Sequence, residues 1–250
     1  MSRKNRASYR LYGDMRAFAG GLVVKFFALF RIVVYRLPPR SALDRVYRRA
    51  ALSSPIDFNR QETVNQLWAD HEAQEAYLSP ACLAFYDEVA NLPQSKGIDC
   101  NGKHIADVGC GTGHLLLSVR KAYRPLSMTG LDFSETAIEI ARTNVPEATF
   151  LCHDIYDSSK EHRFDILFCT ETLEHLLFPD RALRNLLPLL NRPGIAVITV
   201  PDGRKDTFRG HINFWSPESW EVFVREVCQP SEVETGLLKY GSNFAIIRLT

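Results

Sequence analysis

The feature that most constrains the fold is a change of pattern near residue 103, where short apolar runs begin to alternate with stretches of helical spacing. The runs have the length of strands, and short loops separate them from the helical stretches. Such alternation predicts an α/β fold with a doubly wound, mostly parallel sheet that helices cover on both faces. The predicted strands are His104–Val108, Ser127–Leu131, Thr149–Cys152, Asp165–Cys169 and Ile195–Val200, with helices near 115–122, 134–144 and 180–190.

The end of the chain departs from this alternation. Ser216 and Pro217 are typical of a helix start, and the helix is expected to reach about Val227. Two further strands, Val233–Leu238 and Asn243–Arg248, are then separated only by a tight connection around Gly241. Strands joined so closely form an antiparallel hairpin, so the last strand should run against the others.

Three parts of the chain differ in composition and pattern. We expect a basic and apolar arm, a helical region in a position to form a lid, and the sheet-containing domain, over residues 1–40, 41–95 and 96–250. Within the helical region, Trp68, Tyr77 and Phe85 either cover a substrate or pack as ordinary helix core. The sequence Gln94–Gly97 is expected to be a linker.

The amino-terminal arm carries most of the excess positive charge. Residues 1–50 contain twelve Lys or Arg and two Asp, although the net charge of the whole chain is only +1. The stretch 17–37 is long enough to span a bilayer, but Lys25 and Arg31 lie inside it and make a true span costly. We interpret it as an interfacial helix in peripheral contact with a membrane, or alternatively as a helix that caps the domain.

The six cysteines show no close pairing, which favours a reducing compartment. We therefore expect a cytoplasmic protein, at the inner face of the membrane if the arm binds lipid. Residues 96–250 show no basic stripe and no stacking module, which makes a nucleic-acid partner a weak alternative. No sequence feature specifies an oligomeric state.

A glycine-rich loop follows the first predicted strand and enters a helix, in the sequence Asp107-Val108-Gly109-Cys110-Gly111-Thr112-Gly113. Glycines allow a ligand to approach the backbone amides, and a helix amino terminus favours negative charge. Alone this is a weak signal, because a tight turn has the same composition. Three more residues at the carboxyl ends of strands strengthen it: Asp132 can bind ribose hydroxyls, Phe133 can cover a purine, and Asp154 can accept from an adenine amino group.

Taken in order, the motifs DVGCGTGHL, GLDFSETAIEIAR, FLCHDIYD, FDILFCTETLEHL and LLNRPGIAVITVP resemble those of class I S-adenosylmethionine-dependent methyltransferases. The resemblance covers about residues 75–250. It implies a Rossmann-like sheet of seven strands with an antiparallel last strand, and S-adenosyl-L-methionine as cofactor. A dehydrogenase would instead place glycine where this chain has His114. The cofactor contacts that the resemblance implies, together with those argued above, are Asp107, Gly109, Gly111, Gly113, Asp132, Phe133, Asp154, Ile155 and Glu171.

The chemistry of methyl transfer directs attention to the end of the fourth predicted strand. A hydroxyl acceptor needs a base or a metal to remove its proton. Glu171, Glu174 and His175 are spaced so that a helical turn would bring them to one side, and His211 lies in another loop at the same edge. We therefore predict His175, His211 and Glu174 as catalytic candidates.

A divalent metal held by Glu171, Glu174, His175 and His211 is the less favoured alternative. This Glu-x-x-Glu-His pattern resembles that of small-RNA 3′-end methyltransferases and of some quinone-precursor O-methyltransferases. It also occurs in class I methyltransferases without a metal, where the histidine acts as a base or simply packs.

The segment HINFWSPESW resembles one in bacterial methyltransferases that act on sugars and small metabolites. Phe214 and Trp215 would then line an acceptor pocket, unless Trp215 packs the last helix on the sheet. The predicted function is O-methylation of a small molecule, a sugar or a lipid-linked intermediate. The alternatives are an RNA methyltransferase and a non-catalytic scaffold that binds S-adenosylmethionine.

Overall fold

The computed structural model describes residues 59–157 and 163–250, so the arm predicted over residues 1–40 lies outside the described residues. Three helices come first: α3 (Gln61–Ala69), α4 (His71–Tyr77) and α5 (Pro80–Ser95). Within the described ranges, no helix combines the length and the apolar character that crossing a membrane would require.

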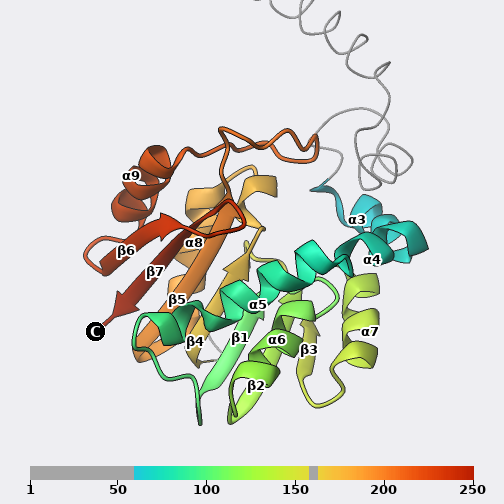
Figure 1. Ribbon diagram of the computed structural model, residues 1–250, viewed down its shortest axis with the longest axis horizontal. Helices are drawn as coiled ribbons and strands as arrows, with labels where there is room; N and C mark the ends of the chain where they lie inside the picture. The colour runs from blue at the N-terminus through green and yellow to red at the C-terminus, as the bar shows by residue number, and fades with distance from the viewer. Residues whose placement is uncertain (1–58, 158–162) are drawn as a thin grey trace, which may run out of the picture. The chain divides into compact units, whose positions relative to one another are not determined.

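A single seven-stranded sheet forms the centre of the described chain (Figure 1), with strand order β3-β2-β1-β4-β5-β7-β6. Neighbouring strands from β3 to β5 pair in parallel, and β7 pairs antiparallel with both β5 and β6. The predicted doubly wound fold, the hairpin and the reversed last strand are therefore confirmed. The strands are β1 (His104–Val108), β2 (Ser127–Asp132), β3 (Thr149–Cys152), β4 (Phe164–Thr170), β5 (Leu190–Pro201), β6 (Glu232–Leu237) and β7 (Ser242–Leu249).

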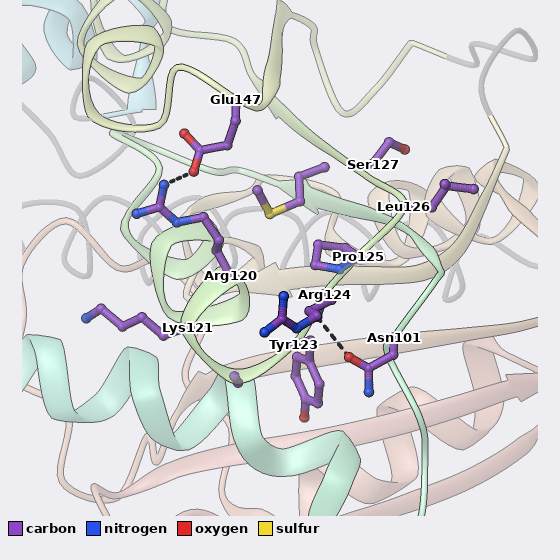
Figure 2. A pocket seen from close by; sticks show the side chains of 11 residues that line it. Asn101, Arg120, Lys121, Tyr123, Arg124, Pro125, Leu126, Ser127 and Glu147 are labelled. Carbon is purple, nitrogen blue, oxygen red and sulfur yellow. Dashed lines mark hydrogen bonds and ion pairs between the residues drawn. The ribbon is translucent and has the colours of Figure 1, made fainter.

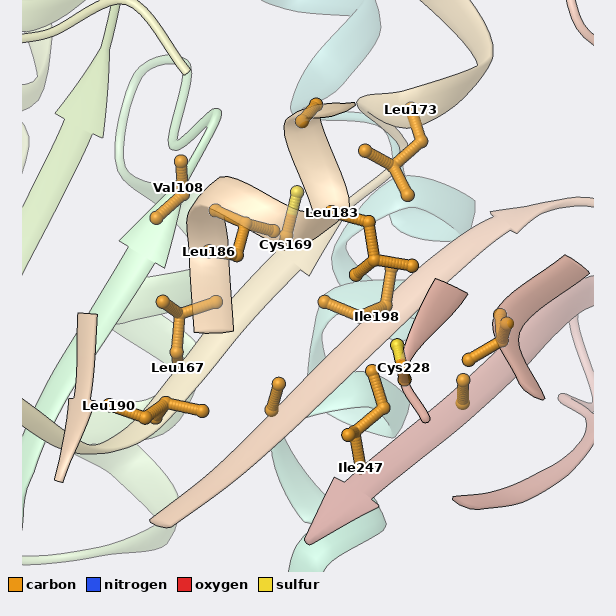
Figure 3. Packing of buried hydrophobic residues seen from close by; sticks show 14 of the residues in the cluster. Val108, Leu167, Cys169, Leu173, Leu183, Leu186, Leu190, Ile198, Cys228 and Ile247 are labelled. Carbon is orange, nitrogen blue, oxygen red and sulfur yellow. The ribbon is translucent and has the colours of Figure 1, made fainter. Parts of the chain in front are cut away.

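The two faces of the sheet bury different sets of side chains, because successive residues of a strand point to opposite faces. Ile105 and Phe168 pack with α5, α6 (His114–Ala122) and α7 (Glu135–Asn144). The alternate residues, such as Ala106 and Leu167, pack with α8 (Pro179–Leu186) and α9 (Pro217–Val227). Figure 3 shows part of this second cluster, where Leu183 of α8 lies over the sheet.

Serine side chains cap the amino termini of three of the helices. The hydroxyls of Ser79, Ser134 and Ser216 accept from the amide three residues further on, at the starts of α5, α7 and α9. Each satisfies one backbone donor that a helix start otherwise leaves unpaired. The predicted start of the last helix at Ser216 and Pro217 is confirmed.

Two predicted boundaries are wrong by a few residues. The expected linker begins too early, because Gln94 and Ser95 belong to α5, which ends only where Gly97 takes a φ of +71°. The amide of Ile98 then donates to the Pro93 carbonyl, which is the hydrogen bond of a glycine-terminated helix end. The helix expected to reach residue 190 ends at Leu186, because Pro188 has no backbone N–H to continue the helical hydrogen bonds; a short 3₁₀ turn, η3 (Leu187–Leu189), leads into β5.

Candidate active site

The glycine-rich loop connects β1 to α6 at the carboxyl edge of the sheet. Gly109 and Gly113 have φ angles of +76° and +84°, which side chains rarely adopt. A Cβ at Gly109 would also lie 2.2 Å from the Thr172 Oγ1 atom, so the loop packs directly against the segment that follows β4. Both the backbone angle and the lack of space beside Thr172 therefore require glycine at position 109.

Asp132, the last residue of β2, holds this loop in place. One carboxylate oxygen accepts from the Gly111 amide and the other from the Ser134 amide, both at 2.8 Å. Burial raises the pKa of Asp132 against the lowering effect of these hydrogen bonds. Each oxygen has a further lone pair, and Asp132 lines the cavity described below, as a ligand of ribose hydroxyls would.

Asp107 in β1 is a buried carboxyl group whose Oδ1 atom has no hydrogen-bond partner. Burial and the nearby negative charge of Asp132 raise the pKa of Asp107 to about 8. Such a group is costly unless a donor or a positive charge approaches it. An ammonium group in the adjoining cavity would meet this requirement.

A cavity of about 650 Å³ lies over the carboxyl ends of β1, β2 and β4. Phe133, Asp154 and Ile155 line it beside the glycine loop, at the places expected for contacts with a nucleoside. Residues of helices α3, α4 and α5 also line it, and Trp68 packs on Tyr77 there with ring centroids 4.8 Å apart. The aromatic residues of the predicted lid, Trp68, Tyr77 and Phe85, all line the cavity.

The segment after β4 brings a second polar group to the same cavity. Glu174 and His175 lie on a short 3₁₀ turn, η2 (Leu173–His175), and His211 reaches them from the loop after β5. The expected turn does not include Glu171, which has a φ of +48°. The Glu171 carboxylate instead accepts from the Thr199 hydroxyl at 3.1 Å, and burial raises its pKa.

Glu174 is fully buried, and neither of its carboxylate oxygens has a hydrogen-bond partner. The Nε2 atoms of His211 and His175 lie 3.7 Å and 3.9 Å from Oε1. Burial and then the charge of Glu171 raise the pKa of Glu174 well above its usual value. The Glu174, His175 and His211 side chains each offer a ligand atom, and these atoms lie within 4.8 Å of one another.

Both histidines are oriented by hydrogen bonds at Nδ1, which leaves Nε2 facing Glu174. His175 Nδ1 lies 3.2 Å from the Gly210 carbonyl oxygen, which can only accept. Burial and the neighbouring His211 lower the pKa of His175 to about 3, so this ring is neutral at physiological pH. His211 Nδ1 lies 2.5 Å from the Asp206 carboxylate.

Asp206 is a residue of the site that the sequence analysis missed. Burial opposes its ionisation, but hydrogen bonds from His211 and from the Phe208 amide outweigh burial and lower the pKa of Asp206. A carboxylate held in this way fixes the tautomer of the imidazole that it contacts. The only signal in the sequence was the spacing Asp-x-x-x-x-His in a loop after a strand.

Phe214 and Trp215, which were predicted to line an acceptor pocket, have different surroundings. Trp215 packs on Trp220 and Phe223 of α9, with ring centroids 5.5 and 5.2 Å apart. Phe214 is 51% exposed and lies beside His211, with ring centroids 6.5 Å apart. Neither residue lines the cavity.

A second hollow, of about 760 Å³, lies at the opposite, amino-terminal edge of the sheet (Figure 2). Arg120 pairs with Glu147 there, and the Arg124 amide donates to the Asn101 side chain at 2.8 Å. None of the predicted site residues lines this hollow. The candidate active site is therefore the cavity over β1, β2 and β4, although the hollow is larger.

The protein is a doubly wound α/β protein by the order of its strands. Proteins of this kind bind nucleoside cofactors at the carboxyl edge of the sheet, where this chain has its glycine loop and its acids. Residues 99–235 match the family model described as a methyltransferase domain. The chain therefore belongs to this methyltransferase family, and the predicted membership of the class I S-adenosylmethionine-dependent enzymes is confirmed.

Curated relatives align with part of the chain. It is 39% identical over 102 residues to a ubiquinone biosynthesis O-methyltransferase of Coxiella burnetii, covering 39% of this chain and 42% of that protein. It is 30% identical over 102 residues to a trans-aconitate 2-methyltransferase of Escherichia coli, covering 41% and 40%. The chain thus spans about two fifths of the length of these relatives.

Solved structures share the fold. The N-methyltransferase NodS of Bradyrhizobium japonicum, in complex with S-adenosyl-L-homocysteine, superposes with a TM-score of 0.59 at 17% sequence identity. The match covers 76% of this chain and 97% of that one.

Proposed function

We propose that this protein transfers a methyl group from S-adenosyl-L-methionine to a hydroxyl oxygen of a small, uncharged acceptor. The observation that carries the proposal is a single cavity that polar groups of two kinds line. The unpartnered Asp107 and the loop-binding Asp132 fit the amino group and ribose of the cofactor, and the Glu174 cluster fits the acceptor. S-Adenosylmethionine supplies the electrophilic methyl group when bound.

The charges around the cavity favour an acceptor without a negative group. Among the described residues that line it there is no lysine or arginine, whereas five carboxylic acids do line it. A carboxylate or phosphate on the acceptor would find no positively charged side chain there to pair with. This is a difference from the trans-aconitate relative, whose named substrate is a carboxylate.

His211 is the residue that we propose accepts the proton of the acceptor hydroxyl. Its Nδ1 is bound to Asp206, so Nε2 carries the lone pair, and His211 and its neighbour Glu174 both line the cavity. An ionised Asp206 stabilises the imidazolium that forms when the hydroxyl proton is transferred. His175 is a poor base, because burial and the neighbouring His211 strongly lower its pKa.

A divalent cation held by Glu174, His175 and His211 is the second candidate for this part of the site. The donor set fits, because a buried carboxylate without a partner faces two imidazole Nε2 atoms whose Nδ1 atoms are already fixed. A cation there would supply Lewis-acid chemistry that lowers the pKa of the acceptor hydroxyl.

Chelation separates these two candidates. Protein treated with a chelator and dialysed should lose activity and regain it with added Mg²⁺, Mn²⁺ or Zn²⁺ if the cation is required. Metal content measured on the same samples provides the control. Full activity with no bound metal would leave His211 as the proton acceptor and reject the cation.

The proposed function as a whole is tested with labelled S-adenosylmethionine and a panel of neutral and carboxylated hydroxy-aromatic and sugar acceptors. We expect transfer of the labelled methyl group to the neutral acceptors. Transfer to their carboxylated analogues should be at least about tenfold slower. Calorimetry with S-adenosyl-L-homocysteine checks the cofactor part separately. A protein that binds no S-adenosyl-L-homocysteine would contradict the proposal at its first step.

Replacing Asp132 with alanine should weaken cofactor binding by about 1–3 kcal/mol, the cost of losing hydrogen bonds to a charged group. The substitution removes both the proposed ribose contact and the acceptor for the Gly111 amide. Calorimetry with S-adenosyl-L-homocysteine measures the loss, and circular dichroism verifies that the variant folds. Unchanged affinity in a folded variant would remove Asp132 from the ribose role.

A further inference from the structure

Three large apolar side chains of the described chain are exposed around one side of the cavity mouth. Leu177, Phe178 and Phe214 are 54%, 56% and 51% exposed, and we call them the apolar rim. Exposed apolar groups that occur singly need no explanation, but a contiguous group beside a binding cavity marks a contact surface. Leu177, Phe178 and Phe214 form such a surface only if they lie close together and beside the cavity.

Hydrogen bonds and ring contacts connect the apolar rim to residues that line the cavity. The Phe178 amide donates to the Tyr156 hydroxyl at 3.0 Å, and the two rings lie 6.3 Å apart. The Asn213 side-chain amide donates to the Leu176 carbonyl at 2.6 Å, which ties the loop bearing Phe214 to the segment bearing Leu177. Tyr156 and Leu176 both line the cavity, so the rim lies directly at its mouth.

Exposed cations stand beside aromatic rings at this mouth. The Arg181 guanidinium lies 5.4 Å from the centre of the Tyr156 ring. The Lys239 ammonium lies 5.6 Å from the centre of the ring of Tyr240, another residue that lines the cavity. Apolar side chains combined with tyrosine and basic groups suit the interface of a bilayer, where the acyl region adjoins anionic headgroups.

We propose that the apolar rim docks on a lipid bilayer that contains anionic headgroups, so that the cavity takes its acceptor from the membrane. The acceptor part of this statement rests on the proposed function, whereas the docking part does not. The sequence of residues 17–37, apolar with Lys25 and Arg31 inside it, has the same combination of groups and argues for a bilayer rather than a protein partner. Docking at the rim would place the mouth of the cavity at the membrane surface.

Quenching of tryptophan fluorescence by lipids with brominated acyl chains tests the contact directly. The full chain is made as Phe178→Trp and, as a matched control, as Leu126→Trp, which replaces an exposed leucine at the opposite edge of the sheet. Both variants keep the three native tryptophans. Vesicles of brominated phosphatidylcholine and phosphatidylglycerol should quench the Phe178→Trp variant more strongly. Equal quenching of the two variants would overturn the proposal.

Co-sedimentation with unlabelled vesicles of the same two lipids gives a second measurement. The triple variant Leu177→Ser, Phe178→Ser, Phe214→Ser should have a partition coefficient lower on the order of tenfold, with Leu126→Ser unchanged. Absence of vesicle binding by the unmodified chain, or equal binding by the triple variant, would overturn docking. Loss of a dimer in the triple variant without an effect on vesicle binding would assign the rim to a second copy instead. Calorimetry with S-adenosyl-L-homocysteine on the same samples reports separately on the proposed function.

Discussion

Replacing His211 with asparagine is expected to lower kcat for methyl transfer to a hydroxyl by about 10²–10⁴-fold, the usual contribution of a positioned proton acceptor. Asparagine keeps a polar group of similar size but cannot take a proton. Initial rates with labelled S-adenosylmethionine at saturating acceptor measure the effect. Affinity for S-adenosyl-L-homocysteine should stay within about threefold of the unmodified protein, because His211 belongs to the acceptor end of the cavity.

Two further variants show whether this effect is specific. Asp206→Asn should lower kcat less than His211→Asn, because the imidazole remains but its tautomer is no longer fixed by the 2.5 Å contact. His104→Asn provides the matched control, since His104 is an exposed histidine in β1 at the other edge of the sheet. A His211→Asn enzyme with the original kcat would exclude this residue as the proton acceptor.

Replacing Asp107 with asparagine should have two opposite effects. Affinity for S-adenosylmethionine should fall by about 2–5 kcal/mol, because the cofactor's ammonium group would lose its buried carboxylate partner. The stability of the ligand-free protein should rise, because the pKa of Asp107 is about 8 in the folded state and near 3.9 for an unfolded chain. Between these values the unfolded chain releases the proton more readily, so the carboxyl group destabilises the fold increasingly as pH rises from about 4 to about 8.

Thermal melting from pH 4 to pH 8 without ligand measures this second effect. The Asp107→Asn variant should melt several degrees above the unmodified protein near pH 7, since about 1 kcal/mol corresponds to roughly 2–4 °C in a chain of this size. The difference should shrink toward pH 4, where the carboxyl stays protonated in the folded state and also becomes protonated in a growing share of unfolded chains. Asp107→Asn melting at or below the unmodified protein at pH 7 would contradict the argument.

Asp165 supplies the control with the opposite sign. Burial raises the pKa of Asp165, but hydrogen bonds from the His104 amide and the Asn191 side chain outweigh it and lower the pKa overall. Its ionised form therefore stabilises the fold above its unfolded pKa, and that contribution is lost as pH falls through the folded pKa. Asp165→Asn should accordingly melt lower than the unmodified protein near pH 7.

The sheet and the acids at its carboxyl edge could be predicted because they depend on local signals. Strand length, alternation of apolar residues and glycines after a strand all act over a few residues, and Asp107 and Asp132 take their places from them. The number of strands and the reversed last strand then followed from the resemblance to a known family, whereas the order of the strands was not predicted. The boundaries that were wrong depended on details of helix ends at Gly97 and Pro188 that compete with apolar spacing.

The Asp206–His211 pair could not be predicted in the same way. Asp206 and His211 lie in a loop without periodicity, and their contact depends on backbone hydrogen bonds from Ile212 and Asn213 to the Glu174 carbonyl. Those bonds join segments almost forty residues apart in the chain, so no local pattern encodes them. The direction of the Glu171 side chain toward Thr199 likewise depends on the neighbouring strand β5.

The contact between Gly109 and Thr172 has a consequence for how such sequences can change. Both positions line the cavity, and no space remains between them for even one methyl group. A side chain at position 109 would collide with Thr172, and the positive φ would strain it even beside a smaller residue at 172, so we expect position 109 to remain glycine among descendants of this chain. Divergence on the acceptor side is thereby limited by the shape of the cofactor loop, so that a change of substrate has to arise elsewhere along the cavity wall.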